Sequence, residues 1–206
     1  DWQLPYLTPD NPLCKEYGLE KVSNVFWNIE MPCIEVLADM EDTGIAFDFE
    51  LDEKLSNKYH KQLDENLDEF YRVLDMFKVE INTYMANNPN NKLSDPINIG
   101  SPTQLAILLY DILKLTSPNP AKPRGTGSEI LVEIDNPICK AILDYRATAK
   151  LLTTYVDKLP ECVNPKTGRI HCNFNQCGAK TGRMSSDNPN MQNIPSKNHD
   201  IRQMFV

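Results

Sequence analysis

The segment NPICKAILDYRATAKLLTTYVDKLP, residues 136–160, is followed directly by ECVNPKTGRIHCNFNQC, residues 161–177. In the first segment Asn136 and Pro137 form a helix start, and apolar residues then recur at helical spacing to about residue 158. In the second segment apolar and polar residues alternate from residue 170 to residue 175, which is the period of a strand. The pattern predicts a protein that is mainly α with a small β portion (α+β), with a sheet that begins after residue 160.

Helical spacing also predicts two helices nearer the N-terminus. The first 25 residues, which contain three prolines, indicate irregular structure around short helical pieces. One helix follows from residue 24 to residue 41 and is closed by Gly44 as a C-terminal cap. The next helix begins with Asp48 as its cap and continues to Met85, so we expect a long stalk with a solvated charged face.

A shorter helix is expected between two irregular segments. The capping-box pattern at Ser101–Gln104 predicts a helix from residue 102 to residue 114. Before it, residues 87–100 are rich in Asn and broken by prolines, which is typical of a loop. After it, SPNPAKPRGTGS, residues 117–128, has three prolines and two glycines and predicts an exposed, mobile tip between two long helices. The basic residues of this tip are Lys122 and Arg124.

The composition is typical of a soluble globular protein. Hydrophobic residues make up 41% of the 206-residue chain, which is enough for a substantial core. No apolar run approaches the roughly 18 residues that a membrane span needs, and the N-terminus lacks a basic-then-apolar signal pattern. We therefore expect a cytoplasmic protein, or one in the host cytoplasm if a phage encodes it, without a membrane partner.

The cysteines predict ordinary reduced thiols rather than a metal site. The six cysteines are scattered along the chain and form no C-x-x-C pair. His171, Cys172 and Cys177 are close in sequence, but neighbouring strand residues point to opposite faces and no second ligand pair follows. No zinc site is expected.

The charge is distributed unevenly along the chain. The net charge of −8 alone argues against a nucleic-acid partner, because phosphate contacts need Lys and Arg. However, residues 1–149 hold 13 basic and 25 acidic side chains, whereas residues 150–206 hold eight basic and four acidic ones. This asymmetry indicates an anionic partner at the C-terminal end.

The stretch GAKTGRMSSDNPNMQNIPSK, residues 178–197, gathers hydrogen-bonding side chains in one loop-like run. Donors and acceptors on a Gly- and Pro-shaped backbone suit phosphate, sugar and minor-groove contacts. The run contains no plausible pair of nucleophile and base. From the residues alone, a polar surface loop stabilised by Asx turns is an equally good interpretation.

Within this run, TGRMSSDNPNMQNIP, residues 181–195, resembles the TGRLSS-x-x-PNLQNIP signature of family A DNA polymerases, the bacterial polymerase I class. The resemblance continues upstream through LDYRATAKLLTTYVDKLP, residues 143–160, and NPKTGRIHCNFNQ, residues 164–176. It also includes INIGSPTQLAILLYDIL, residues 97–113, and IEMPCIEVLADMEDTGIAFD, residues 29–48. The asparagine-rich loop and the abundant turn residues indicate a phage-like member.

The resemblance implies a division of the chain into three parts. Residues 1–28 would be a connector or the tail of an upstream exonuclease-like domain. Residues 29–160 would be a helical thumb region, and residues 161–206 the N-terminal part of the palm.

The family's chemistry implies that this chain lacks the catalytic centre. In the family, two Mg²⁺ ions held by palm aspartates assist attack of a primer 3′-hydroxyl on the α-phosphate of a nucleotide. The first of these aspartates would follow shortly after Phe205, so we expect no catalytic residue and no metal ligand here, and an inactive fragment. The expected partners are primer–template DNA and the remainder of the polymerase, palm and fingers, in cis or as a second chain.

The resemblance also implies roles for individual residues. In the family, the arginine of the TGR motif reaches the minor groove at the primer terminus, and Arg183 occupies that position. Side chains of the PNLQN motif lie against the primer–template, which nominates Asn190, Gln192 and Asn193. The other nominated DNA-binding residues are Thr181, Ser186 and Lys197 in the same stretch, Lys150, Thr153 and Thr154 on the preceding helix, and Lys122 and Arg124 at the tip.

Two alternatives stay open at this point. A stand-alone DNA-binding or clamp module without enzymatic activity would carry the same contacts, and it predicts a fold with no exposed apolar sheet edge after Phe205. An unrelated helical structural protein with a chance match is the other alternative.

Overall fold

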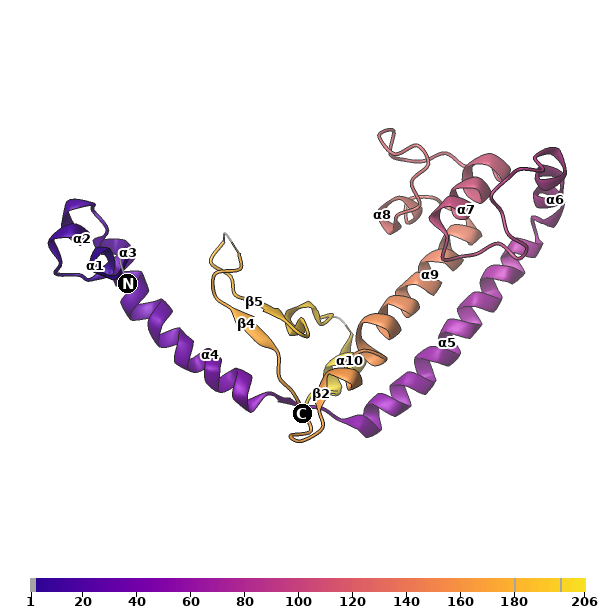
Figure 1. Cartoon of the computed structure of the whole chain (residues 1–206). Helices are drawn as coiled ribbons and strands as arrows, with labels where there is room; N and C mark the ends of the chain where they lie inside the picture. The colour runs from indigo at the N-terminus through magenta and orange to yellow at the C-terminus, as the bar shows by residue number, and fades with distance from the viewer. Residues whose placement is uncertain (1–2, 180, 197) are drawn as a thin grey trace. The chain divides into compact units, whose positions relative to one another are not determined.

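The computed structural model describes residues 3–179, 181–196 and 198–206 of the chain (Figure 1). The chain divides into two compact units. Unit 1 consists of Asp1–Asp52 together with Lys158–Val206, and unit 2 consists of Glu53–Asp157. Both contain helices, and the strands are short and antiparallel, which confirms the predicted fold class. The division into connector, thumb and palm parts at residues 28 and 160 stays a prediction.

The elements follow one another in a simple order. In the N-terminal part of unit 1 they are α1 (Leu4–Leu7), α2 (Pro12–Glu16), α3 (Glu20–Val25), η1 (Phe26–Glu30), α4 (Met31–Thr43) and β1 (Ile45–Ala46). Helix α5 (Phe49–Asp75) leads into unit 2, which continues with α6 (Lys78–Asn87), α7 (Pro102–Ala106), η2 (Ile107–Ile112), α8 (Ser128–Leu131), α9 (Pro137–Leu151) and η3 (Leu152–Val156). The chain then returns to unit 1 with η4 (Pro160–Cys162), β2 (Val163–Asn164), β3 (Arg169–Ile170), β4 (Asn173–Asn175), β5 (Ser185–Asp187), η5 (Met191–Asn193) and α10 (His199–Gln203).

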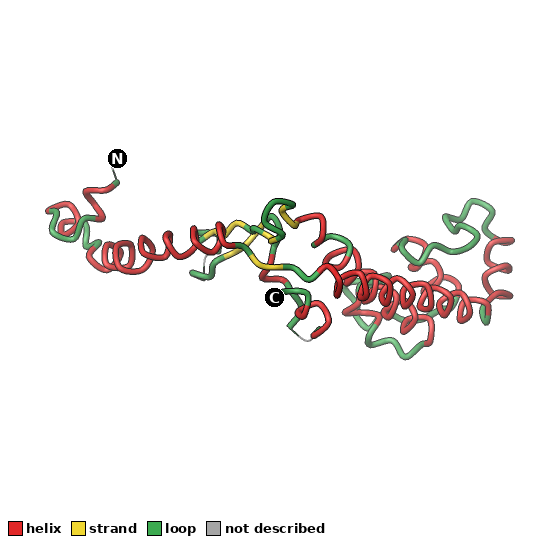
Figure 2. The backbone as a smooth tube through the Cα atoms, turned by 90° about the horizontal axis from the view of Figure 1, so that it is seen from below, coloured by secondary structure: helices red, strands yellow, loops and turns green. Residues whose placement is uncertain are grey.

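Unit 2 is built on α5 and α9, which lie side by side and antiparallel (Figures 1 and 2). The side-chain amide of Asn66 on α5 donates to the hydroxyl of Thr148 at 3.0 Å and to the carbonyl of Asp144 at 3.2 Å. Helices α6, α7 and α8 gather at one end of this pair (Figure 1). The pair therefore forms a support for the loops at that end.

A hydrophobic cluster holds these elements together. Its members come from α5, α6, α7, η2, α8 and α9 and from the loop before α7. Each large apolar side chain that is fully buried contributes roughly 1.5–3 kcal/mol to folding. The cluster members with no exposed surface include Phe70, Leu105, Leu108, Leu109, Ile138 and Ile142.

The predicted single helix from Asp48 to Met85 is wrong, because the chain leaves the helix between α5 and α6. The backbone N–H groups of Met76 and Phe77 donate to carbonyls three residues earlier, which tightens the last turn of α5. Helix α6 then takes a different direction (Figure 1) and buries Ile81 in the same hydrophobic cluster. Burial of apolar side chains on α6 thus outweighs the continuity that the spacing predicts.

The other three predicted helices are confirmed, and each contains a π-helical segment. These segments are η1 before α4, η2 after α7 and η3 after α9. In η2 and η3 the closing hydrogen bonds join N–H groups to carbonyls five residues earlier, from Leu113 to Leu108 and from Asp157 to Leu152. The wider turn was not predicted, because the apolar spacing of the sequence does not distinguish it from an α-helix.

Local chemistry sets the helix starts as predicted. Asp48 accepts from the N–H of Leu51 at 2.9 Å, and Asn136 accepts from the N–H two residues on at 3.0 Å. Ser101 accepts from the N–H of Gln104 at 3.4 Å. The reciprocal half of the predicted capping box is not formed, because the side-chain oxygen of Gln104 accepts instead from the N–H of Asn98 at 2.8 Å.

Unit 1 contains two small antiparallel sheets. In the first sheet the order is β1-β3-β2, and in the second β4 pairs with β5. The continuous strand predicted from residue 170 to residue 175 is therefore wrong, because β3 and β4 belong to different sheets. Glu41 of α4 redirects the chain between them: its carbonyl lies 2.8 Å from Nδ1 of His171, and its carboxylate accepts from the N–H of Phe174.

Gly44 ends α4, as predicted. Its N–H donates to the carbonyl of Met40 at 2.9 Å, and its φ of +64° lies in the region that favours glycine. A Cβ atom at this position would lie 2.8 Å from both Nδ1 of His171 and the carbonyl oxygen of Ile170. Only glycine therefore allows the helix to end against β3.

No helix in the part of the chain that the structure describes is long and apolar enough to cross a membrane. The six cysteines are free thiols, and Cys14, Cys139 and Cys172 are buried. Burial raises the pKa of the Cys139 thiol to about 11, so this side chain is neutral and unreactive at neutral pH.

Candidate nucleic-acid interface

The run of residues 181–195 forms the end of the β4–β5 hairpin and the turn that follows it. Strand pairing places Phe174 opposite Ser186, and the side chain of Asn173 donates to Asp187 at 3.0 Å. At the other end of β4, the side-chain amide of Gln176 donates to the carbonyl and the carboxylate of Glu30 at 3.0 and 2.9 Å. The hairpin is thus fixed to the helical part of unit 1 before its connecting loop begins.

Ser186 is the centre of the turn after β5. It is 3% exposed, and its hydroxyl accepts from the N–H groups of Met191 at 3.1 Å and Gln192 at 3.3 Å. The same hydroxyl donates to the side-chain oxygen of Asn190 at 3.3 Å, and that oxygen also accepts from the N–H of Gln192 at 3.1 Å. Ser186 and Asn190 therefore shape the backbone, and this network fixes the short helix η5.

The turn leaves the other polar side chains at the surface. Gln192 and Asn193 on η5 are exposed. Gln192 also lines a cavity of about 460 Å³ with Ile45, Ile194 and Arg202 among its other walls. All three PNLQN residues nominated from the sequence are thus exposed, but the side-chain oxygen of Asn190 is bonded to the hydroxyl of Ser186 and the N–H of Gln192.

The TGR motif lies just before β5. Gly182 adopts a φ of +73°, and its N–H donates to the carbonyl of Ala179 at 3.2 Å. This turn leaves Thr181 and Arg183 exposed on either side of the glycine. Two nearby lysines, Lys180 and the nominated Lys197, lie outside the described residues.

The nominated residues of α9 and η3 are exposed as well, and they belong to unit 2. Lys150 lies in the last turn of α9, and Thr153 and Thr154 follow on η3. The hydroxyl of Thr153 donates to the carbonyl of Ala149 at 2.9 Å, so it retains its capacity to accept a further hydrogen bond. These side chains form a polar surface on one unit, separate in sequence from the hairpin loop on the other.

The tip loop, residues 117–127, carries the two nominated cations, and each has a carboxylate partner. Lys122 lies 3.4 Å from Glu129, with both side chains more than 60% exposed. Arg124 binds Asp111 in a bidentate pair at 2.5 and 2.8 Å. The hydrogen bond from Arg124 lowers the pKa of the Asp111 carboxyl, so the pair stays charged at neutral pH.

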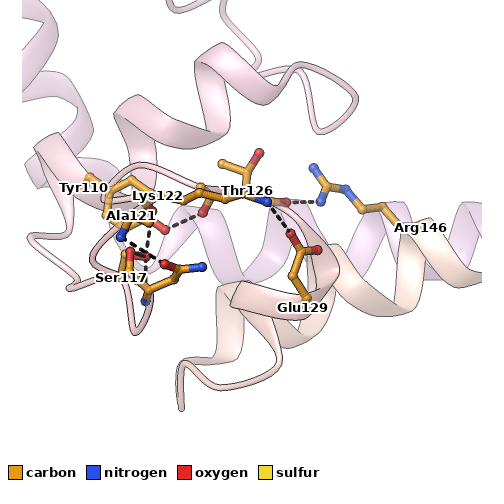
Figure 3. Close-up of polar contacts among 9 residues, drawn as sticks. Tyr110, Ser117, Ala121, Lys122, Thr126, Glu129 and Arg146 are labelled. Carbon is orange, nitrogen blue, oxygen red and sulfur yellow. Dashed lines mark hydrogen bonds and ion pairs between the residues drawn. The ribbon is translucent and has the colours of Figure 1, made fainter.

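Sequence reasoning missed both carboxylate partners and two donors that contact the tip loop. Asp111 precedes Arg124 by 13 residues, and no local pattern connects them. Tyr110 and Arg146 donate to backbone carbonyls of the tip loop (Figure 3). The signal that could have indicated them is the composition of the loop, because a segment with three prolines has more carbonyls than N–H groups.

The described residues do not form a site for the two Mg²⁺ ions expected for the intact polymerase. Among them, no group of three or more His, Cys, Asp and Glu side chains could hold a metal ion. The ring nitrogens of His171 face the carbonyl of Glu41 and the hydroxyl of Thr167, each at 2.8 Å.

Comparison with known proteins gives one consistent family. Residues 54–206 match DNA polymerase family A. DNA polymerase I of Chloroflexus aurantiacus is 36% identical over 200 residues, which cover 89% of this chain and 19% of that protein. The thermostable DNA polymerase I of Thermus filiformis is 34% identical over 195 residues, covering 91% of this chain and 21% of the relative. The chain thus spans about a fifth of the length of these relatives.

A solved structure is also similar. It is the POL domain of Pol1 from M. smegmatis in complex with DNA primer–template and dNTP. The TM-score is 0.74 at 30% sequence identity, and the match covers 94% of this chain and 32% of that one.

The network around Ser186 predicts a local loss of stability in a Ser186→Ala variant. The N–H of Met191 would lose its acceptor in a partly buried position, at a cost of about 1–3 kcal/mol, whereas the N–H of Gln192 would keep the side-chain oxygen of Asn190. Urea unfolding monitored by circular dichroism measures this cost, and hydrogen exchange at residues 190–193 locates it. Ser185→Ala is the control, because Ser185 lies on the opposite face of the same strand. Equal effects of the two substitutions would contradict the role of Ser186.

Proposed function

Because the chain belongs to DNA polymerase family A, we propose that it binds a primer–template DNA duplex as part of a DNA-directed DNA polymerase. The observation that carries this proposal is the stretch of residues 181–193 in unit 1, which contains the end of the β4–β5 loop, β5 and η5. There a buried serine and a glycine at positive φ hold the backbone, and Arg183 and Gln192 are left exposed. The relatives named DNA polymerase I and the similar POL domain with bound primer–template support it.

The chemistry of this loop suits recognition of a duplex irrespective of its sequence. Adenine N3 and thymine O2 present acceptors in the minor groove, and A·T and T·A pairs look alike there. A guanidinium and a carboxamide offer donors that fit these acceptors. In this proposal Arg183 and Gln192 test the geometry of base pairs near the primer terminus, and Asn193 and Thr181 add contacts beside them.

The exposed residues of unit 2 would contact the DNA backbone. Lys150 supplies a positive charge, and Thr153 and Thr154 supply hydroxyls, which are the usual partners of phosphate oxygens. The tip loop adds Lys122 and Arg124. In the proposed division, this unit belongs to the thumb and the hairpin loop belongs to the palm.

We further propose that the chain binds duplex but does not incorporate nucleotides alone. The carboxylates that hold Mg²⁺ would come from the remainder of the polymerase, in cis or as a second chain. The phage-like character and the cytoplasmic location stay predictions, which neither the fold nor the relatives test.

The first test is binding of the chain to a fluorescent primer–template with a recessed 3′ end and to a blunt duplex. We expect preference for the primer–template, and we expect Arg183→Ala to reduce that preference by roughly tenfold, since one good minor-groove donor pair is lost. Arg72→Ala is the control, because Arg72 is a surface arginine paired with Glu69 on α5. Equal binding to both DNAs by the wild-type chain would favour a stand-alone DNA-binding module.

The two tip cations are expected to differ in the salt dependence of duplex binding. Lys122 can exchange its exposed partner Glu129 for a phosphate at little cost, so Lys122→Ala should reduce the slope of log K against log salt by about one. Arg124→Ala should reduce the slope by less, because Arg124 is held in a bidentate pair with Asp111. Lys61→Ala on the exposed face of α5 is the control. An unchanged slope in Lys122→Ala would exclude the tip from the interface.

Nucleotide incorporation tests the absence of activity. The chain mixed with primer–template, Mg²⁺ and deoxynucleoside triphosphates should extend no primer, because the described residues form no site for the metal. The thermostable DNA polymerase I of Thermus filiformis serves as the positive control. Template-dependent extension by this chain alone, abolished by Arg183→Ala, would refute the proposal that it is inactive.

A further inference from the structure

Two neighbouring carbonyl oxygens of the tip loop are bound by side chains from two different elements (Figure 3). The hydroxyl of Tyr110 on η2 donates to the carbonyl of Gly125 at 2.5 Å. The guanidinium of Arg146 on α9 donates through Nη1 to the carbonyl of Thr126. The loop is therefore attached on both sides, by η2 that precedes it and by α9 that follows it.

The side chains of Tyr110 and Arg146 are both partly buried, so each donor depends on the loop carbonyl that it contacts. Burial raises the pKa of the Tyr110 hydroxyl and lowers the pKa of the Arg146 guanidinium. A partly desolvated donor that loses its acceptor is destabilised, and more so when it is charged. Movement of the loop away from these two side chains would therefore break both hydrogen bonds at partly desolvated positions.

The loop itself is organised by short-range hydrogen bonds. The N–H of Lys122 donates to the carbonyl of Asn119, and the N–H of Gly125 donates to the carbonyl of Lys122, each at 3.0 Å. The hydroxyl of Ser117 donates to the carbonyl of Lys122 at 2.9 Å (Figure 3). Two successive turns therefore connect the cation at residue 122 rigidly to the carbonyl that Tyr110 binds.

The loop also packs closely on the core of unit 2. A Cβ atom at Gly125 would lie 2.1 Å from Cδ1 of Ile130, and Ile130 is 2% exposed. Its side chain has little space in which to move, so residue 125 must be a glycine for the loop to adopt this position.

We propose that Tyr110 and Arg146 are positioning residues for duplex binding, which hold the tip loop in the conformation that presents Lys122 to a DNA phosphate. The inference rests on the proposed function and deepens it. Neither residue needs to touch the DNA, because each acts through a backbone carbonyl of the loop. A loop that is fixed before binding does not lose conformational entropy when a phosphate engages it, and this raises affinity.

The test compares Tyr110→Phe with the wild-type chain. The substitution removes one hydroxyl and keeps the ring in the core, so the fold and the net charge are unchanged. Tyr71→Phe is the matched control, because the Tyr71 hydroxyl also donates to a backbone carbonyl in unit 2, that of Ile97 at 3.5 Å. Hydrogen exchange at residues 119–127 is measured in the free chain, and binding to primer–template is measured across a salt series.

In Tyr110→Phe we expect exchange in the tip loop to become about tenfold faster and duplex binding to weaken about threefold to tenfold. The salt slope should stay the same, because no cation is removed. Tyr71→Phe should change neither quantity. Arg146→Lys, which keeps the charge and loses the guanidinium fork, should change exchange and affinity in the same direction as Tyr110→Phe.

The outcomes separate this inference from the proposed function. If Tyr110→Phe leaves tip exchange unchanged, the loop is not held by this hydroxyl and the inference is wrong. If exchange becomes faster but the affinity for duplex stays at the wild-type value, while Lys122→Ala still weakens binding, the positioning role is wrong and the proposed function survives. If the wild-type chain binds no duplex at any salt concentration, the proposed function fails and the positioning role fails with it.

Discussion

Irregular segments that lie against the fold need partners for their backbone polar groups, and in the described part of this chain side chains supply several of them. The two segments on which the proposed function rests take opposite kinds of partner. The tip loop contains three prolines, which remove N–H groups and leave carbonyls in excess, so it takes donors from Tyr110 and Arg146. In the turn after β5, the N–H groups of Met191 and Gln192 take side-chain acceptors from Ser186 and Asn190. In both places a partly or fully buried polar side chain fixes the shape of an exposed loop.

This division of labour decides which polar residues are left for a ligand. The hydroxyl of Ser186 already accepts two backbone N–H groups. Ser186 therefore holds the turn, although it was nominated from the sequence as a DNA-binding residue. Arg183 and Gln192 are exposed on backbone that other residues have already fixed. The donor groups of these side chains can therefore bind a partner, and the loop would lose little conformational entropy on binding. In the proposed function the signature stretch is therefore both a scaffold and a contact surface, with different residues in the two roles.

What the sequence predicted well is what depends on neighbours in the chain. The fold class, the caps at Asp48 and Asn136 and the helix end at Gly44 follow from residues within four positions of one another. What it failed to predict depends on residues that are distant in sequence. The break before α6 follows from burial of Ile81, the split between β3 and β4 follows from Glu41, and the pairing of Arg124 follows from Asp111. Asp111 and Glu129 also pair with the two nominated cations of the tip loop. Residue types alone did not reveal this, because a sequence does not show whether a Lys or Arg side chain has a carboxylate partner.

In the proposed function, a chain with a net charge of −8 binds DNA through cations of the tip that already have carboxylate partners, without a strongly positive patch. A cation that already has a carboxylate partner gains only the difference between two partners when it meets a phosphate, and this difference is small in water. The electrostatic contribution of the tip to the affinity for DNA is therefore modest, and the geometry of the loop has to supply the rest of that affinity. In the proposed role, the hydrogen bonds at Gly125 and Thr126 fix the loop that carries Lys122 before DNA binds. Little conformational entropy is then lost on binding, so even a small electrostatic gain raises the affinity. Since Asp111 binds Arg124 with two hydrogen bonds and Glu129 binds Lys122 with one, the same loop separates a cation with a mainly structural role from one that can change partners.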